Sequence, residues 1–286
     1  SMRHYCPDVP ICLIADGDVD VSDLEREYEL IVLRIADLPS QKMREMIGGS
    51  YRVKLAAMWE GPFEHYVWMD SDAIVWGDFT DQVRTDLDFQ IFWPEISIPM
   101  NAEEEPAWLA HFYFNLGKLR KFDPDFEWRG HPYFSAGVYA CRRNVISYEQ
   151  WQEVEGWARQ EPGLFQFGDQ GILNYLVHAK SQRGEIKTTW SDLQWSRSFP
   201  RDSLEKDCAL AGWRFPEQIG KPMVLHFCGS KPHTTNFKCF SRPFTIARLA
   251  HHRRYHNSLG AWWTILLDDL RVSLGKLKGR CLNRPV

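Results

Sequence analysis

The fold is decided by the ten residues 66–75, YVWMDSDAIV, in which two carboxylates follow an apolar run. The apolar run is typical of a buried strand. An unpaired carboxylate is far too costly to bury, so Asp70 and Asp72 should stand at the end of that strand and face a cation. Residues two apart in an extended segment project to the same side, with Ser71 turned away or offering its backbone to a ligand. The segment therefore predicts a divalent metal site, and a turn in which the acids only bond the backbone is the alternative.

The amino-acid composition is that of an ordinary globular protein. Of 286 residues, 44% are hydrophobic and 25% are charged, and single α/β domains of this length are common. The net charge of -4 gives no case for a nucleic-acid partner. An aromatic content of 14%, with 13 tryptophans, exceeds what a core requires. Aromatic faces suit sugar rings or bases, so the surplus predicts either such a ligand or a tryptophan-rich core.

The cysteine content and the hydropathy of the chain indicate the cellular compartment of the protein. Seven cysteines, an odd number without a C-x-x-C pair, argue against a disulfide framework and against a structural zinc site. The sequence contains no run of 18 apolar residues. We therefore expect a reducing, cytoplasmic location and no segment that spans a membrane.

Three segments predict the elements that precede the Asp70 strand. Residues 9–15 and 30–35 are short, continuous apolar runs, typical of buried strands. Between Ser50 and Trp59 the apolar residues follow helical spacing, with Ser50 as the N-cap. Near-continuous apolar strands imply a sheet that is covered on both faces and binds ligands beyond its carboxyl ends. The sequence therefore predicts an α/β fold with a single Rossmann-like mixed or parallel sheet flanked by helices.

The pattern changes along the rest of the chain. It loosens over residues 89–128, which predicts a long, partly mobile insertion that carries partner specificity. A second clear helix begins at Ser147, which forms a capping box with Gln150. The composition later becomes basic, so we expect one domain over residues 1–243 and a basic, partly amphipathic helical tail over residues 244–286. The tail suits two roles, a peripheral contact with an anionic membrane surface or docking on its own domain.

Three further segments join the Asp70 motif in order along the chain. They are YFSAGV at residues 133–138, GDQGILN at residues 168–174 and LHFCGSKP at residues 225–232. With the Asp70 motif they resemble one family, glycogenin and the bacterial lipopolysaccharide galactosyl- and glucosyltransferases, which are retaining enzymes of the glycosyltransferase A fold. Four segments in the family's order, spread over most of the chain, make the resemblance specific.

The resemblance implies a hexosyltransferase. Residues 1–243 would be the nucleotide-sugar-binding catalytic domain, with residues 89–128 on the acceptor side. The enzyme would move a hexose from a nucleoside-diphosphate sugar, with UDP as the expected nucleotide, to a glycan, lipid-linked or protein acceptor. Asp169 and Gln170 would lie beside the anomeric carbon, either in a double displacement or as stabilisers of a front-face, oxocarbenium-like transfer.

The same resemblance implies a metal site formed by Asp70, Asp72 and His226. Two carboxylates and an imidazole suit a hard divalent cation, Mn²⁺ or Mg²⁺, and leave positions for diphosphate oxygens. Lys231 would neutralise the departing diphosphate, and Gly229 would let the backbone approach the phosphates closely.

Further donor contacts are expected at Lys54, Ser71 and Ser135. The family carries a basic residue on the helix before the Asp-x-Asp strand, and Lys54, which is followed by leucine, fits its pattern better than Arg52. Residues two apart on a helix point about 200° away from each other, so only one of these two side chains should enter the site. Ser135 stands in the segment that contacts the donor sugar in the family.

The sequence departs from the family at three places. Ser135-Ala136 replaces the usual Asn-Ser pair, which removes an amide that would bind sugar hydroxyls. The loop from Gly229 to Lys231 is one residue shorter than usual. The family has a nucleotide-binding strand before the strand expected at residues 9–15, where only residues 1–8 precede it here. Either this first strand is missing or the fold is rearranged.

Two other functions remain open on the sequence. A haloacid dehalogenase-type phosphatase also places Asp-x-Asp after an apolar strand, with Asp70 as the nucleophile, but this function leaves His226 and its neighbours unexplained. A non-catalytic protein of the same fold would bind a sugar nucleotide or a protein partner.

Overall fold

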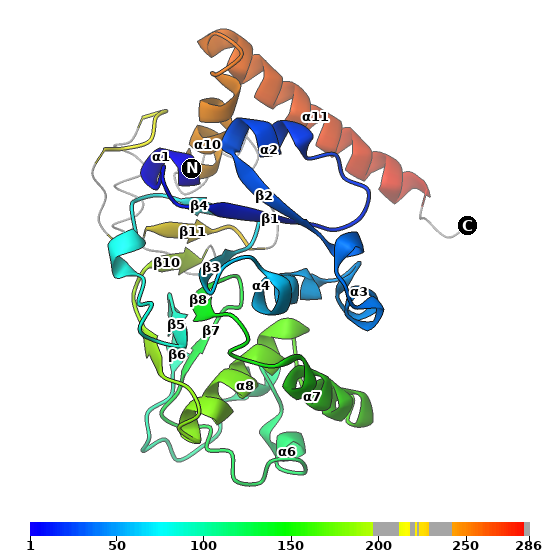
Figure 1. Ribbon diagram of the computed structural model, residues 1–286, viewed down its shortest axis with the longest axis vertical. Coiled ribbons are helices and arrows are strands. Elements are labelled where there is room, and N and C mark those ends of the chain that lie inside the picture. The colour runs from blue at the N-terminus through cyan, green and yellow to red at the C-terminus, as the bar shows by residue number, and fades with distance from the viewer. Residues whose placement is uncertain (197–211, 218–220, 222, 229–241, 283–286) are drawn as a thin grey trace. The chain divides into compact units, whose positions relative to one another are not determined.

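The computed structural model describes residues 1–196, 212–217, 221, 223–228 and 242–282. The chain divides into two compact units. The larger unit comprises Cys6–Asp70 and Phe79–Leu193, and the smaller unit comprises Ser1–Tyr5, Ser71–Asp78 and Gln194–Val286. Both contain helices and strands, and the strands pair in parallel and antiparallel ways (Figure 1), which confirms the predicted mixed α/β class. The described strands form four sheets where we expected one, because none exceeds five residues and the chain enters a different sheet after the Asp70 strand.

The first half of the larger unit follows the predicted order of elements. These elements are β1 (Ile11–Ala15), α2 (Ser22–Tyr28), β2 (Leu30–Arg34), η1 (Ile35–Asp37), α3 (Gln41–Ile47), η2 (Tyr51–Lys54), α4 (Leu55–Glu60) and β3 (His65–Met69). The two strands predicted at residues 9–15 and 30–35 are confirmed as β1 and β2, which pair in parallel. The predicted helix is confirmed as η2 followed by α4, and the Ser50 hydroxyl accepts the backbone N–H of Arg52 as its N-cap.

The second half of the larger unit surrounds a four-stranded sheet of order β3-β8-β5-β9. Its elements are η3 (Thr80–Gln82), β5 (Phe89–Ile91), β6 (Pro94–Ser97), α5 (Ala107–Phe112), α6 (Leu116–Leu119), β7 (Pro132–Phe134), β8 (Val138–Arg142), α7 (Tyr148–Gln160), α8 (Asp169–Gln182) and β9 (Thr188–Trp190). Strand β8 pairs antiparallel with both β3 and β5, and β9 runs parallel to β5. The predicted capping box is confirmed at the start of α7, where Ser147 and Gln150 each bond the other's backbone N–H.

Residues 89–128, where we expected a partly mobile insertion, contain regular elements that pack in the core. This segment contains β5, β6, α5 and α6, and its apolar side chains belong to the core of the larger unit. Leu109, Tyr113, Phe114 and Leu119 are fully buried. The segment is packed because burial of aromatic and leucine side chains stabilises the folded state even where the spacing of these residues is irregular.

The smaller unit contains a three-stranded sheet of order β10-β11-β4. Its elements are α1 (Met2–Tyr5), β4 (Ala73–Val75), β10 (Gln194–Ser196), β11 (Val224–His226), α10 (Arg242–His252) and α11 (Ser258–Leu282). Successive side chains of a strand alternate between its faces. One face therefore presents Ile74, Trp195 and Leu225, which pack in one cluster with Ile246 of α10.

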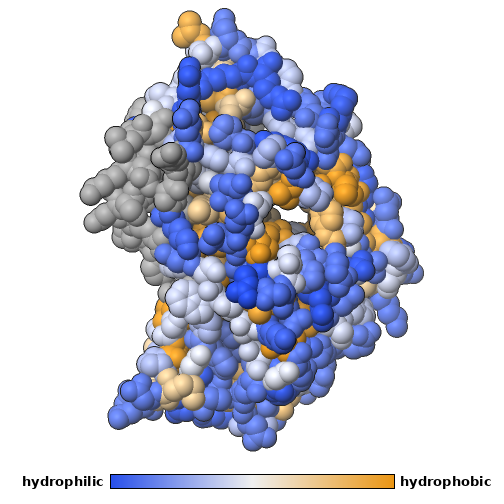
Figure 2. Space-filling model, turned by 60° about the vertical axis from the view of Figure 1, so that its left-hand side comes forward, coloured by the Kyte–Doolittle hydropathy of each residue, from blue (hydrophilic) through white to orange (hydrophobic). Residues whose placement is uncertain are grey.

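The C-terminal segment is helical, as predicted, and its two helices pack on each other. Arg248 of α10 pairs with Asp269 of α11 at 2.7 Å, and Leu249, Ala261 and Ile265 form a small buried cluster. Other apolar side chains of α11 are exposed, with Leu259 at 83% and Trp263 at 64%. On the face drawn in Figure 2, hydrophilic residues predominate and hydrophobic residues form small separate areas. Among the described residues, no helix has the length and apolar character needed to cross a membrane. Peripheral membrane contact by the tail stays a prediction.

A stacked pair of histidines in the core of the larger unit makes its stability depend on pH. His178 of α8 is 2% exposed, and its ring lies 4.5 Å from that of His131, at an interplanar angle of 13°. Burial, and then the neighbouring His131, lower the pKa of His178 well below its ordinary value. The unfolded chain therefore binds a proton that the folded chain does not, so the stability is present above the ordinary pKa of about 6.5 and is lost as the pH falls below it.

We expect the free energy of unfolding to fall by about 1.4 kcal/mol per pH unit for His178 alone between pH 6 and pH 5. Urea unfolding at pH 5, 6 and 7 measures this slope. His178→Phe keeps an aromatic ring in the stack and should flatten the slope by that amount. His256→Phe, a change at an exposed position, should leave it unaltered. Equal slopes in His178→Phe and the native chain would contradict this assignment.

Candidate functional site

Lys54 lies at the centre of a buried group of charges in the larger unit. Its side chain is 8% exposed, and its Nζ lies 2.6 Å from Oδ2 of Asp169 and 3.5 Å from Oδ1 of Asp70. The Nζ also donates a hydrogen bond of 2.9 Å to the carbonyl oxygen of Ala136. One ammonium group therefore joins four places in the fold: η2, the residue after β3, the turn between β7 and β8, and the first turn of α8.

Arg52 points to a different partner. Its Nε lies 2.7 Å from Oε1 of Glu155 on α7, and its Nη1 donates to the carbonyl oxygen of Met46. The helical spacing that separates residues 52 and 54 thus sends only Lys54 to Asp70 and Asp169. Donor binding by Lys54 stays a prediction.

Asp169 is the first residue of α8 and is 6% exposed. Burial raises the pKa of its carboxyl and the charge of Asp70 acts in the same direction, while Lys54 opposes both. Lys54 is therefore what favours the charged form of this carboxylate. The neighbouring Gln170 donates from its amide to the carbonyl oxygen of Phe112 at 3.3 Å, so both predicted catalytic residues lie at the start of α8 with their side chains engaged.

Asp70 is held by Trp68 of the preceding strand β3 and by the turn before β8. The indole Nε1 of Trp68 donates to Oδ1 of Asp70 at 2.8 Å, and the backbone N–H of Asp70 donates to the carbonyl oxygen of Gly137 at 2.8 Å. Sequence reasoning missed Trp68. Trp68 stands two residues before the acid, near the end of β3, and this spacing is the signal that could have identified it.

The backbone at the Asp70 motif is a turn. Strand β3 ends at Met69, Ser71 and Asp72 form the turn, and β4 begins at Ala73. The expectation that both acids share one extended strand end is therefore wrong, because the chain turns there from one sheet into another. The turn does not confine the acids to backbone contacts, since Asp70 meets Lys54 and Trp68.

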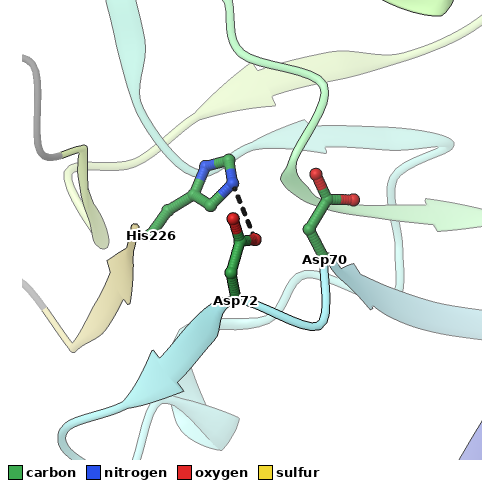
Figure 3. A group of neighbouring side chains, drawn as sticks. All are labelled: Asp70, Asp72 and His226. Atoms are coloured by element: carbon green, nitrogen blue, oxygen red, sulfur yellow. Dashed lines mark ion pairs between the residues drawn. The ribbon is translucent and has the colours of Figure 1, made fainter. Parts of the chain in front are cut away.

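In the smaller unit, Asp72 faces His226 across two paired strands. Oδ1 of Asp72 lies 3.3 Å from Nε2 of His226, and the two side chains are 12% and 4% exposed. Antiparallel pairing of β4 with β11 sets Ala73 opposite His226, and the backbone N–H of Phe227 donates to the carbonyl oxygen of Asp72 at 3.0 Å. The pair is therefore fixed by the register of the sheet (Figure 3).

Asp70, Asp72 and His226 make a set of candidate metal ligands, two carboxylates and one imidazole (Figure 3). Because only Ser71 separates the two acids, their Cα atoms can be no more than about 7 Å apart. Ser71 is exposed, and Ser135 lies in the turn between β7 and β8 that supplies the Ala136 carbonyl. The predicted phosphate-binding residues Gly229 and Lys231 lie outside the described residues.

The chain resembles known proteins in its structure, although no protein-family model and no curated protein sequence matches it. The crystal structure of the galactosyltransferase LgtC in complex with donor and acceptor sugar analogs matches with 15% identity and a TM-score of 0.50, over 86% of this chain and 88% of LgtC. The apo structure of the bifunctional glycosyltransferase WbbM matches with 16% identity and a TM-score of 0.43, over 86% of this chain and 45% of WbbM. Mouse xyloside xylosyltransferase 1, also apo, matches with 14% identity and a TM-score of 0.40, over 77% of this chain and 84% of that one.

The match to LgtC extends over most of both chains and identifies the fold. The protein has a fold of the glycosyltransferase A type, as the four sequence segments predicted. At this level of identity the likeness concerns the fold.

The buried charge group makes a prediction about stability. Lys54→Met should lower the free energy of unfolding by about 3 to 5 kcal/mol, because it leaves the Asp169 carboxylate buried without its cation. Urea unfolding measures the loss. The double variant Lys54→Met with Asp169→Asn should recover most of it, since the remaining amide carries no charge.

Lys121→Met is the matched control, because it removes a lysine that pairs with Glu161 at 2.6 Å at an exposed position. It should leave the stability almost unchanged. If Lys54→Met alone is as stable as the double variant, the Lys54 to Asp169 pair does not determine the stability of this region.

Proposed function

We propose that the protein is a metal-dependent glycosyltransferase that moves a hexose from a nucleoside-diphosphate sugar, with UDP as the nucleotide, to an acceptor with retention of configuration. The observation that carries this proposal is the Asp72 to His226 pair, with Asp70 two residues before Asp72 in the chain, in a fold shared with the galactosyltransferase LgtC. LgtC has been seen in complex with donor and acceptor sugar analogs. Its match supports the reaction class through the fold.

The donor set fits a hard divalent cation. Carboxylate oxygens and a neutral imidazole are ligands that Mn²⁺ accepts, and Mg²⁺ also accepts the carboxylates. The facing arrangement of Asp72 and His226, both nearly excluded from water, supports a cation there, since a buried carboxylate needs positive charge. When bound, the cation would supply Lewis-acid neutralisation of the departing diphosphate. Lys231 and Gly229 complete this proposal as phosphate contacts.

The Lys54 group supports a role at the sugar. Asp169 is a buried carboxylate that Lys54 favours in its charged form, and it can stabilise positive charge that develops at an anomeric carbon. Gln170 offers an amide at the same helix start. Two routes to retention are compatible with these groups, a double displacement through a carboxylate and a front-face transfer that the carboxylate only stabilises.

An exposed pair of aromatic rings next to Asp169 supports an acceptor site. Phe112 of α5 and Phe167 stack with ring centroids 5.9 Å apart, and they are 40% and 60% exposed. Phe167 has a backbone φ of 47°, a conformation that aromatic residues rarely adopt and that persists mostly at functional sites. Sugar rings pack on aromatic faces, so we propose that Phe112 and Phe167 receive the acceptor, in keeping with the acceptor-side role expected for residues 89–128.

Metal and donor binding can be tested by thermal shift. In the presence of 1 mM Mn²⁺, the matching nucleotide sugar at about 100 times its Kd should stabilise the native chain by about 2.7 kcal/mol. Asp72→Ala and His226→Ala should abolish the metal-dependent part of the shift. Asp268→Ala removes a second carboxylate that pairs with a histidine, His252, in the same unit, and should leave the shift intact.

The rival functions have different outcomes in the same samples. Release of phosphate from a generic phosphomonoester that depends on Asp70 would favour the phosphatase. Donor binding with neither hydrolysis nor transfer would favour the non-catalytic protein. A metal-dependent shift that survives both Asp72→Ala and His226→Ala would overturn the metal site.

The acceptor site makes its own prediction. Phe167→Ala should lower kcat/KM for transfer to aryl glycoside acceptors about tenfold, because it removes about 1.4 kcal/mol of ring contact. Hydrolysis of the same donor without acceptor should not change. Tyr255→Ala, which removes another exposed aromatic ring, is the control and should alter neither rate. An equal loss of hydrolysis and transfer in Phe167→Ala would contradict an acceptor role.

A further inference from the structure

Gln194 contacts the ring nitrogen of His226 that lies opposite Asp72. Gln194 opens β10, is 1% exposed, and its side-chain amide lies 3.3 Å from Nδ1 of His226. A polar side chain is buried in this way only when it has a hydrogen-bond partner. The imidazole of His226 is thus bounded by a carboxylate at Nε2 and by an amide at Nδ1.

The position of Gln194 is fixed by the sheet. Strand β10 runs parallel to β11, with Gln194 opposite Val224 and Ser196 opposite His226. Between them, Trp195 points to the other face and packs in the apolar cluster with Leu225. Because side chains alternate along a strand, burial of Trp195 holds Gln194 on the face that carries His226.

The two neighbours determine which ring nitrogen carries the proton. In a neutral imidazole one nitrogen donates and the other accepts. A carboxylate only accepts, so a neutral ring facing Asp72 would carry its proton on Nε2 and would accept at Nδ1 from the amide NH₂ of Gln194. If Nε2 held the cation, the ring would need the opposite tautomer, with the proton on Nδ1 and an acceptor facing it. A glutamine side chain supplies both partners, because rotation of its terminal amide exchanges NH₂ for carbonyl oxygen.

We propose that Gln194 is a positioning residue of the metal site, which holds the His226 ring and changes from donor to acceptor when a cation binds at Nε2. This inference rests on the proposed function. In a neutral ring this exchange would conserve protons, since one proton leaves Nε2 for solvent and another joins Nδ1. Outer groups that orient a metal-binding histidine typically change metal affinity 10- to 100-fold when removed.

The larger unit offers a matched control in Gln90. It is also 1% exposed and lies in a strand, β5. Its amide donates to the carbonyl oxygen of Gln82 at 2.9 Å and to the Ser191 hydroxyl at 3.0 Å, while its Oε1 accepts the backbone N–H of Arg84. Gln90 therefore has a buried amide with a structural role and no histidine partner among these bonds.

The first experiment measures Mn²⁺ affinity by electron paramagnetic resonance at pH 8 in the full chain. Gln194→Met should raise the Kd about 10- to 100-fold. Gln194→Glu restores an acceptor for the Nδ1 proton and should stay within about fivefold of the native chain. Gln90→Met should not change the Kd, although it removes an equally buried amide.

The second experiment reads the tautomer of His226 without relying on activity. Long-range ¹⁵N–¹H spectra of histidine-labelled protein, assigned by difference with His226→Gln, should show the proton on Nε2 without metal and on Nδ1 with Mg²⁺, which is diamagnetic. A proton on Nδ1 in both states would overturn the proposed exchange. The measurement on the native chain needs no Gln194 variant to fold.

The remaining outcomes separate this inference from the proposed function. If the native chain binds Mn²⁺ and Gln194→Met binds it equally well, the role of Gln194 is overturned and the metal site stands. If Gln194→Glu loses more Mn²⁺ affinity than Gln194→Met does, Gln194 has only a packing role. The acceptor at Nδ1 would then bring no benefit, and the buried charge of the glutamate would be more harmful than loss of the amide. If the native chain does not bind Mn²⁺ or Mg²⁺, the metal site itself fails.

Discussion

The larger unit depends on one buried ion pair, between Lys54 and Asp169. Removing two charges from water costs several kcal/mol per ion, and an apolar pair of similar volume would stabilise a fold at least as well. The ammonium also meets Asp70 and the Ala136 carbonyl, so it ties three segments to the start of α8. Since stability alone does not favour such a group, its presence points to a site that needs charges in fixed positions.

The smaller unit uses the alternation of short strands for the same purpose. Three residues each in β4, β10 and β11 suffice to bury Ile74, Trp195 and Leu225 on one face and to keep Gln194 and His226 on the other. The apolar face supplies the free energy that holds the sheet together. The register of the strands then fixes the positions of polar groups that contribute little to stability themselves. In both units, therefore, apolar packing holds the strands and helices that orient the polar side chains.

The sequence predicted what local interactions determine. The strands β1 and β2, the Ser50 cap and the Ser147 capping box follow from apolar runs and from hydrogen bonds within four residues. Contacts between distant segments were harder to predict. The packed segment over residues 89–128 lacks a regular period, and the turn at Asp72 depends on the pairing of β4 with β11, more than 140 residues later. Gln194 carries no local signal at all, because its partner is defined only once β10 pairs with β11.

The replacement of the family's Asn-Ser pair by Ser135-Ala136 has a limited effect on this arrangement. What the segment gives to Lys54 is the carbonyl oxygen of Ala136, and what it gives to Asp70 is the carbonyl oxygen of Gly137. Backbone carbonyls are present whatever the side chains are, so the substitution leaves the charge group intact. Its consequence falls on the two side chains: residue 135 carries a hydroxyl in place of an amide, and residue 136 lacks a hydroxyl. In the proposed function this change of side chains would bear on the choice of sugar, while the carbonyl contacts to Lys54 and Asp70 are unaffected.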